Sequence, residues 1–322
     1  MERIGLSDKK KPLIIIAGPT AAGKTKTSIL LAKKVDGEII SADSMQVYRY
    51  MDIGSAKVTP EEMQGVPHHL IDVLEPTEEF NVVRFQIMAK AAMEDIYARG
   101  RIPILVGGTG FYIQSILYDI DFTENEADTA YRHELEHLAK EQGSEALYRM
   151  LMEADPEAAE ELHPNNIKRV IRALEYHHLT GQKISEHNQE QRHKSSPYEA
   201  YYFVLTMDRA KLYQRIDLRV DLMLEQGLIE EVKKLKAMGL TQNDVSMQGL
   251  GYKEILAFLE GEATLEEAIY TIKRDTRHFA KRQLTWFRRE PEAIWIDCDP
   301  DKRTAEDIVS ELLKYISGRG EI

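Results

Sequence analysis

The hydrophobic pattern of the N-terminal third alternates between strand and helix. Residues Lys11–Ala17 form a continuous run of mostly branched apolar side chains that ends at a Gly-Pro pair, which is typical of a buried strand. From Lys24 to Lys34 the apolar positions take helical spacing, and strand patterns follow at Glu38–Ala42 and Ile102–Val106. This alternation predicts an α/β fold, a parallel sheet with helices on both faces. Ligands of such sheets bind at the carboxyl ends of the strands.

The middle of the chain has a different pattern. Between residues 122 and 199 strand-like runs vanish, and charged helical stretches replace them at Tyr131–Gln142 and Asn166–Leu179. A strand pattern returns at Tyr201–Met207, and a short one follows further helices at Ala293–Asp297. We therefore predict an α/β core with C-terminal helices, made of residues 1–121 and 200–322, and an all-helical insertion domain at 122–199.

Composition and charge limit the class of protein. With 43% hydrophobic and 30% charged residues over 322 positions, the chain can bury a large core, which excludes disorder for most of it. No apolar run is long enough to span a membrane, and the N-terminus lacks the pattern of a secretory signal. The single cysteine, Cys298, excludes internal disulfides, so we expect a cytoplasmic location. The net charge of −12 argues against non-specific nucleic-acid binding, although a local basic face remains compatible with it.

The strongest motif follows the first predicted strand and matches G-x-x-x-x-G-K-[ST]. Its glycines let the backbone curl so that N–H groups point at phosphate oxygens, and the N-terminus of the next helix favours negative charge. The lysine adds a mobile positive charge, and the last hydroxyl is placed to hold Mg²⁺. We therefore predict a di- or triphosphate site, with Thr25 as metal ligand, formed by Gly18, Pro19, Thr20, Ala21, Ala22, Gly23, Lys24 and Thr25.

One acidic residue, Asp43, stands at a predicted strand end. Nucleotide hydrolases usually carry a second strand that ends in an aspartate and helps to hold the metal. Here the strand at Ile102–Val106 is followed by glycines and Thr109, which leaves Asp43 as the only acid expected at this edge. The residue type and position fit a metal ligand, a helix N-cap or a general base equally well.

Eight sequence blocks occur in order along the chain: GPTAAGKT at 18–25, DSMQVY at 43–48, DIGSAK at 52–57, VPHHLID at 66–72, VGGTGFY at 106–112, KRVIRALE at 168–175, QGLGYKE at 248–254 and KRQLTWFR at 281–288. This succession resembles the bacterial tRNA dimethylallyltransferases, also called tRNA isopentenyltransferases. The resemblance implies a core like that of the P-loop NTPases. It also implies transfer of a dimethylallyl group from dimethylallyl diphosphate to the exocyclic amine of the adenosine 3′ of the anticodon in tRNA, with release of diphosphate.

The resemblance gives each candidate residue a role. Asp43 corresponds to the general base that takes a proton from the adenine amine. Thr109 matches a threonine at the catalytic opening, and Arg219 matches an arginine that reaches the leaving group. The phosphate loop would then hold a prenyl donor and Mg²⁺ instead of hydrolysing a nucleotide, through Thr20, Lys24 and Thr25.

The resemblance also implies a surface for the tRNA anticodon stem-loop. The target base must be flipped out of its stack, and Gln46 is placed to contact its edge. The most basic segment is 273–289, with seven Lys or Arg and one acid, Asp275. On it Arg274, Arg277, Lys281 and Arg288 can share one helical face near Trp286 and Phe287, although a solvated face paired with acids is the ordinary alternative. The predicted tRNA contacts are Asp43, Ser44, Met45, Gln46, Arg132, Lys168, Arg169, Arg172, Gln248, Gly251, Tyr252, Lys253, Lys281, Arg282 and Arg288.

Three other interpretations compete with the transferase. The H-E-x-x-H at His133–His137 resembles a zinc hydrolase motif, but no pattern marks a third ligand. A small-molecule or nucleotide kinase would share the phosphate loop, the Mg²⁺ and the core. A non-catalytic RNA-binding module would bind tRNA without forming a product. The ordered blocks favour the transferase, which we expect to act as a monomer.

Overall fold

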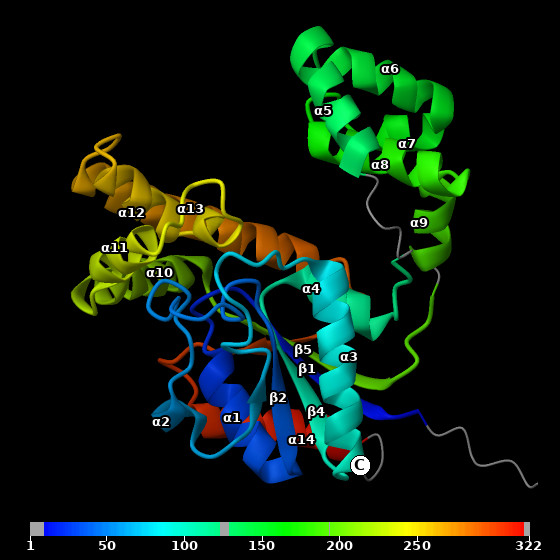
Figure 1. Cartoon of the computed structure of the whole chain (residues 1–322). Helices are drawn as coiled ribbons and strands as arrows, with labels where there is room; N and C mark the ends of the chain where they lie inside the picture. The colour runs from blue at the N-terminus through cyan, green and yellow to red at the C-terminus, as the bar shows by residue number, and fades with distance from the viewer. Residues whose placement is uncertain (1–9, 123–128, 193, 319–322) are drawn as a thin grey trace, which may run out of the picture. The chain divides into compact units, whose positions relative to one another are not determined.

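The computed structural model describes residues 10–122, 129–192 and 194–318 (Figure 1). Its centre is a six-stranded sheet whose neighbouring strands are all parallel, in the order β3-β2-β4-β1-β5-β6. The strands are β1 (Pro12–Ala17), β2 (Gly37–Ala42), β3 (His68–His69), β4 (Ile102–Gly107), β5 (Glu199–Thr206) and β6 (Ile294–Asp297). The predicted α/β fold is confirmed, and each strand predicted from the sequence is present with ends shifted by at most two residues.

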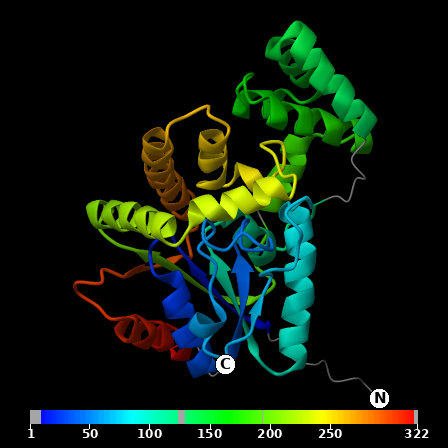
Figure 2. The same ribbon diagram turned by 60° about the vertical axis from the view of Figure 1, so that its left-hand side comes forward.

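Helices cover both faces of the sheet. On one face α1 (Lys24–Val35) and α14 (Ala305–Ser317) pack together, and their apolar residues share a buried core with alternate side chains of β1 and β5. On the other face α3 (Val82–Ala98) and α4 (Gly110–Leu117) pack against β4 (Figures 1 and 2). The apolar runs of the central strands are continuous because both of their faces are buried.

A group of C-terminal helices packs together and belongs to the same compact unit as the sheet. Its members are α10 (Arg209–Glu225), α11 (Leu228–Ala237), the 3₁₀ helix η1 (Ser246–Gln248), α12 (Tyr252–Leu259) and α13 (Leu265–Phe287), while α2 (Pro60–Met63) is a single turn after β2. In the described parts of the chain, no helix is long and apolar enough to cross a membrane.

The strand register brings several loops to one edge of the sheet. Ala17, the last residue of β1, lies opposite Gly107 of β4 and Val204 of β5, and Ala42 of β2 also lies opposite Gly107. The chain therefore leaves β1, β2 and β4 at the same level. The phosphate loop, the segment at Asp43 and the glycine turn after β4 each start at one of these strand ends. The register therefore explains why these three segments form one site.

The chain folds into two compact units, residues 1–117 with 196–322, and residues 118–195. Both limits of the second unit fall a few residues before those expected from the sequence. At the second limit the chain rejoins the first unit at Ser196, whose carbonyl accepts from Lys10 Nζ at 2.6 Å. The second unit is helical and has its own apolar core, which includes Leu147 and Leu174. Its helices are α5 (Thr129–Gln142), α6 (Ser144–Ala154), α7 (Pro156–Glu161), α8 (Ile167–Thr180) and α9 (Ile184–Arg192).

Strand β3 was not predicted, because its two residues are polar histidines. It is held at the edge of the sheet by Glu38 of β2, whose side chain is only 2% exposed. His69 Nε2 lies 2.7 Å from Glu38 Oε2, and the guanidinium groups of Arg99 and Arg101 donate to the same carboxylate at 2.8–3.0 Å. Although burial opposes ionisation, these hydrogen bonds lower the pKa of Glu38 to about 2.

Candidate active site

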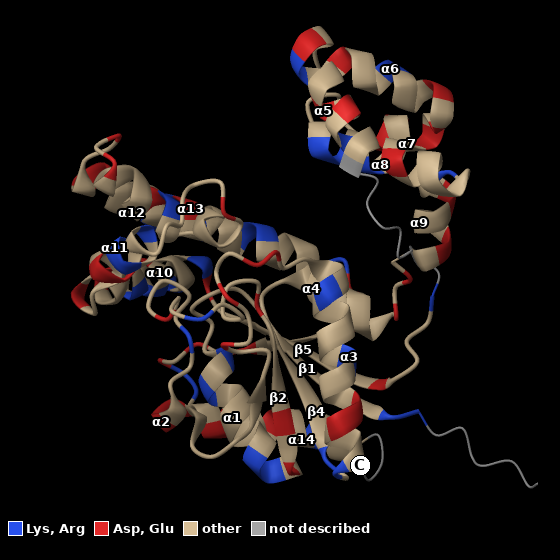
Figure 3. Ribbon diagram, in the orientation of Figure 1, with Lys and Arg blue, Asp and Glu red and all other residues tan. Residues whose placement is uncertain are grey.

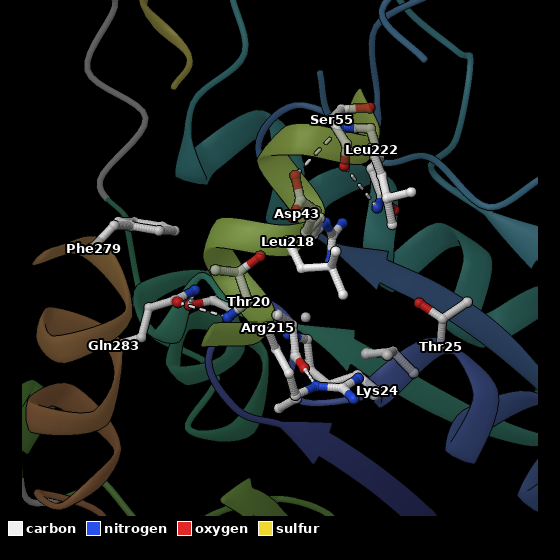
Figure 4. Close-up of a pocket in the computed structure, with 18 residues that line it drawn as sticks. Thr20, Lys24, Thr25, Asp43, Ser55, Arg215, Leu218, Leu222, Phe279 and Gln283 are labelled. Carbon is white, nitrogen blue, oxygen red and sulfur yellow. Dashed lines mark hydrogen bonds between the residues drawn. The ribbon is translucent and has the colours of Figure 1, made fainter. Parts of the chain in front are cut away.

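A cavity of about 360 Å³ lies at the carboxyl edge of the sheet (Figure 4). It is enclosed by the phosphate loop, the segments that follow β2 and β4, and the facing sides of α10 and α13. The lining residues are Thr20, Ala21, Ala22, Gly23, Lys24, Thr25, Asp43, Gln46, Ser55, Val106, Gly107, Gly108, Arg215, Leu218, Arg219, Leu222, Phe279 and Gln283. The sequence prediction placed the ligand at this edge.

The phosphate loop has a backbone that requires glycine. Gly18 has φ +146°, and a Cβ on it would stand 2.7 Å from the carbonyl oxygen of Leu205 in β5. Gly23, at φ +88°, precedes the first turn of α1. With both glycines the loop curls around the N-terminus of α1, where the helix dipole favours an anion.

Lys24 is half-buried and folds back on its own loop. Its Nζ donates to the carbonyls of Gly18 at 3.0 Å and Pro19 at 2.8 Å. Burial, assisted by the positive charge of Arg219, lowers the pKa of Lys24 to about 8, although the Asp43 carboxylate opposes the change. Burial also lowers the pKa of Arg219 from its ordinary value, again against the pull of Asp43. These desolvated cations gain most from an anion that enters the cavity.

Asp43 directly follows β2 and orders the segment after it. Its Oδ1 accepts from the backbone N–H of Met45 at 2.8 Å and of Gln46 at 3.3 Å. Both of these backbone donors bind the same carboxylate oxygen, Oδ1. One carboxylate oxygen therefore performs the turn-capping role, while the carboxylate itself lines the cavity and stays available for a metal ion or a proton.

Gln46 and Ser55 form the wall beside Asp43. The side-chain oxygen of Gln46 accepts from Ser41 Oγ at 3.1 Å, and its Nε2 donates to the carbonyls of Ala56 at 3.3 Å and Ser55 at 3.5 Å. The amide of Gln46 is thus held by protein contacts in this structure. It ties the segment after Asp43 to the loop that carries Ser55.

The chain matches the family model described as IPP transferase over residues 46–290 and one described as isopentenyl transferase over residues 11–77. It is 61% identical over 307 residues to the tRNA dimethylallyltransferase of Lachnoclostridium phytofermentans, a match that covers 95% of this chain and 98% of the relative. The chain belongs to the IPP transferase family. The resemblance predicted from the ordered sequence blocks is confirmed.

Solved structures of IPP transferases share the fold over 97% of this chain. The tRNA isopentenylpyrophosphate transferase of Bacillus halodurans is 48% identical, with a TM-score of 0.73 over 97% of its own chain. The corresponding enzyme of Staphylococcus epidermidis is 41% identical, with a TM-score of 0.72 over its whole chain. A eukaryotic dimethylallyltransferase acting on tRNA is 32% identical, with a TM-score of 0.85 over 81% of its chain.

In this IPP transferase, Thr109 lies next to the cavity and is not one of its lining residues. It is half-buried at the start of α4, where its carbonyl accepts from the N–H groups of Tyr112 and Ile113. The neighbouring Gly108 lines the cavity. A Cβ on Gly108 would collide with the side chain of Gln283, so this glycine lets α13 approach the strand end.

Several cavity residues were missed by sequence reasoning. Arg215 lies one helical turn before Arg219 on α10, and its Nε donates to the carbonyl of Ala21 at 2.9 Å. Gln283 Oε1 accepts from the N–H of Thr20 at 3.0 Å, and its Nε2 donates to the carbonyl of Gly108 at 2.9 Å. Gln283 therefore joins the two loops that flank the cavity. The sequence feature that could have identified Gln283 is its position within the KRQLTWFR block.

The expectation of a single acid at this edge was wrong. Asp297 ends β6, and Asp299 follows it. Asp299 is 1% exposed and pairs with Lys211 Nζ at 2.8 Å, while Asp208, just after β5, caps α10. Although the last predicted strand ends at Asp297, the sequence did not show where this strand joins the sheet, because β6 comes from the far end of the chain. None of them lines the cavity described above.

Of the tRNA contacts predicted around Tyr252, two residues are buried and two are exposed. Tyr252 has no exposed surface, and its hydroxyl donates to Glu231 Oε1 at 2.8 Å. Gly251 is also buried, and the exposed side chain of Gln248 donates to a backbone carbonyl of its own loop. Lys253 is exposed. Tyr252, which we predicted to contact tRNA directly, is instead buried. The sequence did not show this, because the polar partners of its hydroxyl lie in other parts of the chain.

The basic residues of α13 divide into two groups. Three of them pair with carboxylates: Lys273 with Asp221 at 2.6 Å, Arg274 with Asp275 at 2.7 Å, and Arg277 with Asp217 at 2.5 Å. Toward the C-terminus Lys281, Arg282 and Arg288 are exposed, and the described residues place no carboxylate in ion-pair contact with them. Among the described residues, the expected shared face of Arg274, Arg277, Lys281 and Arg288 therefore lacks carboxylate partners only at Lys281 and Arg288. Figure 3 shows the Lys and Arg positions of the ribbon in blue and the Asp and Glu positions in red.

The two aromatic residues near these cations pack against other parts of the protein, Phe287 fully buried and Trp286 half-buried. Phe287 has no exposed surface. Trp286 packs edge-on against Phe111, with ring centroids 6.1 Å apart, and a Cβ on Gly110 would collide with its indole. Of the two roles considered for this pair, stacking or packing, the structure shows packing.

In the helical unit of residues 118–195 the cations predicted to contact tRNA also differ from one another in ion pairing and exposure. Arg132 donates to the buried carboxylate of Glu175 at 2.7 and 2.6 Å, so its guanidinium stabilises the core of this unit. On α8, Lys168 and Arg169 are exposed and Arg172 is half-buried.

His133 and His137 have exposed side chains and lie 3.4–3.6 Å from glutamates of their own helix. Across the described ranges, no group of three or more His, Cys, Asp or Glu side chains is arranged to hold a metal ion.

Proposed function

We propose that this IPP transferase moves a dimethylallyl group from dimethylallyl diphosphate to the exocyclic amine of the adenosine 3′ of the anticodon in tRNA, releasing diphosphate. One observation carries the proposal: three cations, an apolar wall and a carboxylate line the same cavity. The family relationship favours this reaction over phosphate transfer by a kinase.

The cavity suits the two chemically different halves of the donor. Lys24, Arg215 and Arg219 supply positive charge beside the phosphate loop, where the diphosphate would bind. Leu218 and Leu222, one turn apart on α10, keep 59% and 45% of their surface exposed although they are apolar. Together with Phe279 of α13 they form an apolar wall (Figure 4) that would bury the dimethylallyl group.

Asp43 would receive the proton of the acceptor amine. In the transfer, a bond forms between the adenine N6 and the allylic carbon while the carbon–oxygen bond to the diphosphate breaks. The amine loses its proton to Asp43, and the departing diphosphate takes the bonding electron pair. A general base of this kind contributes roughly 10²–10⁴-fold in rate, and fixed cations stabilise the leaving charge.

The donor set also fits Mg²⁺. The exposed Thr25 hydroxyl is a hard oxygen ligand that lines the cavity, and a diphosphate would add more. Bound there, Mg²⁺ would neutralise charge on the diphosphate. Thr25 is the residue that would hold it, which leaves the Asp43 carboxylate to act as the base.

Two exposed basic groups are the proposed tRNA contacts. The first consists of Lys281 and Arg282 of α13 with Arg288 at its C-cap, and the second of Lys168 and Arg169 on α8 of the helical unit, next to the half-buried Arg172. Cations without a carboxylate partner can neutralise RNA phosphates without first breaking an ion pair. The cytoplasmic location and the monomeric state stay predictions from the sequence.

The test is transfer of labelled dimethylallyl diphosphate to unmodified tRNA with Mg²⁺, with a parallel reaction that contains ATP and tRNA. Label on the adenosine beside the anticodon supports the proposal. ATP consumption without label in the RNA would contradict it and would support a kinase.

The variant Asp43→Asn tests the base. Asparagine keeps an oxygen for the N–H groups of Met45 and Gln46 but cannot take up the proton, so we expect the rate to fall by roughly 10²–10⁴-fold. The matched control is Asp36→Asn at the exposed C-cap of α1, whose left-handed backbone suits asparagine. Wild-type transfer by Asp43→Asn would refute the role of Asp43.

A further inference from the structure

A buried carboxylate of α11, Glu231, holds a loop of the active-site wall by its backbone. Its Oε2 accepts from the N–H groups of Asp52 at 2.9 Å and Ile53 at 2.8 Å, and its Oε1 accepts from Gly54 N–H at 3.0 Å. Three consecutive amides thus converge on one side chain. Hydrogen bonds from N–H groups to a carboxylate are stronger than those between neutral groups, and more so when they are buried.

Tyr252 completes this arrangement. Its hydroxyl donates to Glu231 Oε1 at 2.8 Å and accepts from the N–H of Ser55 at 3.1 Å. Burial and the nearby Glu231 carboxylate raise the pKa of Tyr252 well above its ordinary value, so the hydroxyl keeps its proton and donates it to Glu231. The four amides of residues 52–55 are therefore all bound by two buried side chains, which we call the amide clamp, Glu231 and Tyr252.

Two glycines let the clamp approach. A Cβ on Gly54 would stand 2.6 Å from the Tyr252 ring, and a Cβ on Gly249 would stand 2.6 Å from Met45 Cε. The sequence blocks DIGSAK and QGLGYKE are thus in contact through Gly54 and Tyr252. The second block also touches the segment that follows Asp43. This packing gives the QGLGYKE block a structural role, since Gly251 and Tyr252 of the block are buried.

The clamped loop forms part of the cavity beside Asp43. Ser55 lines the cavity, and its carbonyl accepts from the Gln46 side chain. Gln46 N–H in turn donates to Asp43 Oδ1. A continuous set of hydrogen bonds therefore runs from Glu231, which does not line the cavity, to the carboxylate that does.

We propose that Glu231 and Tyr252 are positioning residues that fix residues 52–55, so that Ser55 and Gln46 present a rigid wall to the acceptor adenine beside Asp43. The proposal rests on the function proposed above. It predicts that the clamp serves the acceptor and leaves the diphosphate site unchanged, because the phosphate loop, Arg215 and Arg219 share no hydrogen bond with it among the described residues.

The principal variant is Glu231→Gln, which keeps the volume but turns an NH₂ group toward the amides. The matched control is Glu230→Gln on the same helix, an exposed residue that pairs with Lys233. We expect the single-turnover transfer rate of Glu231→Gln to fall about ten-fold or more, while the Kd of dimethylallyl diphosphate changes by less than about two-fold. A purely structural role would reduce donor binding and transfer alike, in proportion to the folded fraction.

Tyr252→Phe keeps the ring beneath Gly54 and removes only the hydroxyl, so it decides the question if Glu231→Gln does not fold. We expect it to lower transfer about three- to ten-fold, again with unchanged donor binding. Wild-type transfer by the folded variants, or a loss shared equally with donor binding, would overturn the clamp. Absence of transfer by the wild-type protein would instead overturn the proposed function.

Discussion

Raising the pH from 7 to 9 tests whether Lys24 binds the diphosphate as a cation. Because the pKa of Lys24 is lowered to about 8 in the free protein, roughly 90% of it is charged at pH 7 and roughly 10% at pH 9. A bound diphosphate stabilises the charged form and raises that pKa. Binding of the diphosphate is therefore coupled to proton uptake by Lys24. The affinity for the diphosphate is highest well below pH 8 and decreases as the pH rises above 8. We expect about a ten-fold loss of affinity between pH 7 and pH 9.

The other charged groups around Lys24 do not titrate in this range. Burial raises the pKa of Cys298 to about 11, and arginines such as Arg219 stay protonated. A diphosphate ester has its last pKa near 6, so it is fully ionised from pH 8 upward. The change in affinity above pH 8 can therefore be assigned to Lys24.

The assay is calorimetric binding of dimethylallyl diphosphate at constant Mg²⁺, repeated in two buffers with different ionisation enthalpies to count protons. Lys24→Arg, which keeps its charge, should show no decrease between pH 7 and 9. Lys24→Met should bind weakly at every pH. Equal affinity of the wild-type protein at pH 7 and 9, or a Lys24→Met variant with the same pH dependence, would refute the reasoning.

Three further predictions concern stability, RNA binding and the clamp. Because its pKa is about 2, ionised Glu38 stabilises the fold by ~3 kcal/mol above pH 5, and this contribution is lost as the pH falls toward 2. The free energies of unfolding of the wild type and of Glu38→Gln, measured in urea, should therefore converge in acid. Replacing Lys281 or Arg288 with alanine should lower the slope of log K for tRNA against log salt by about 1 each, whereas the paired Lys273 should change it less. Gly54→Ala should slow transfer with normal donor binding, since the new Cβ meets the clamp tyrosine; an unaffected rate would count against that contact.

The parts of the fold and site that could be predicted from the sequence are those whose signal lies within one continuous segment of the chain. Strand β1, the phosphate loop and α1 are continuous, and each carries its own signal in apolar runs, glycines and helical spacing. Strand β3 lacked such a signal, since its histidines depend on Glu38 from another strand. The same holds for Tyr252: its neighbours in the chain suggested an exposed block, whereas Glu231 and Gly54 make it a buried support.

The basic segment of α13 shows why counting charges identifies an RNA surface poorly. The sequence showed seven cations against one acid over residues 273–289. In the structure α10 lies against α13 and brings Asp217 and Asp221 to Arg277 and Lys273, which neutralises the half of the segment that faces it. The cations beyond residue 280 extend past these acids. An acidic protein can therefore keep a basic face where its own carboxylates do not reach, and the place of that face follows from helix packing rather than from local composition.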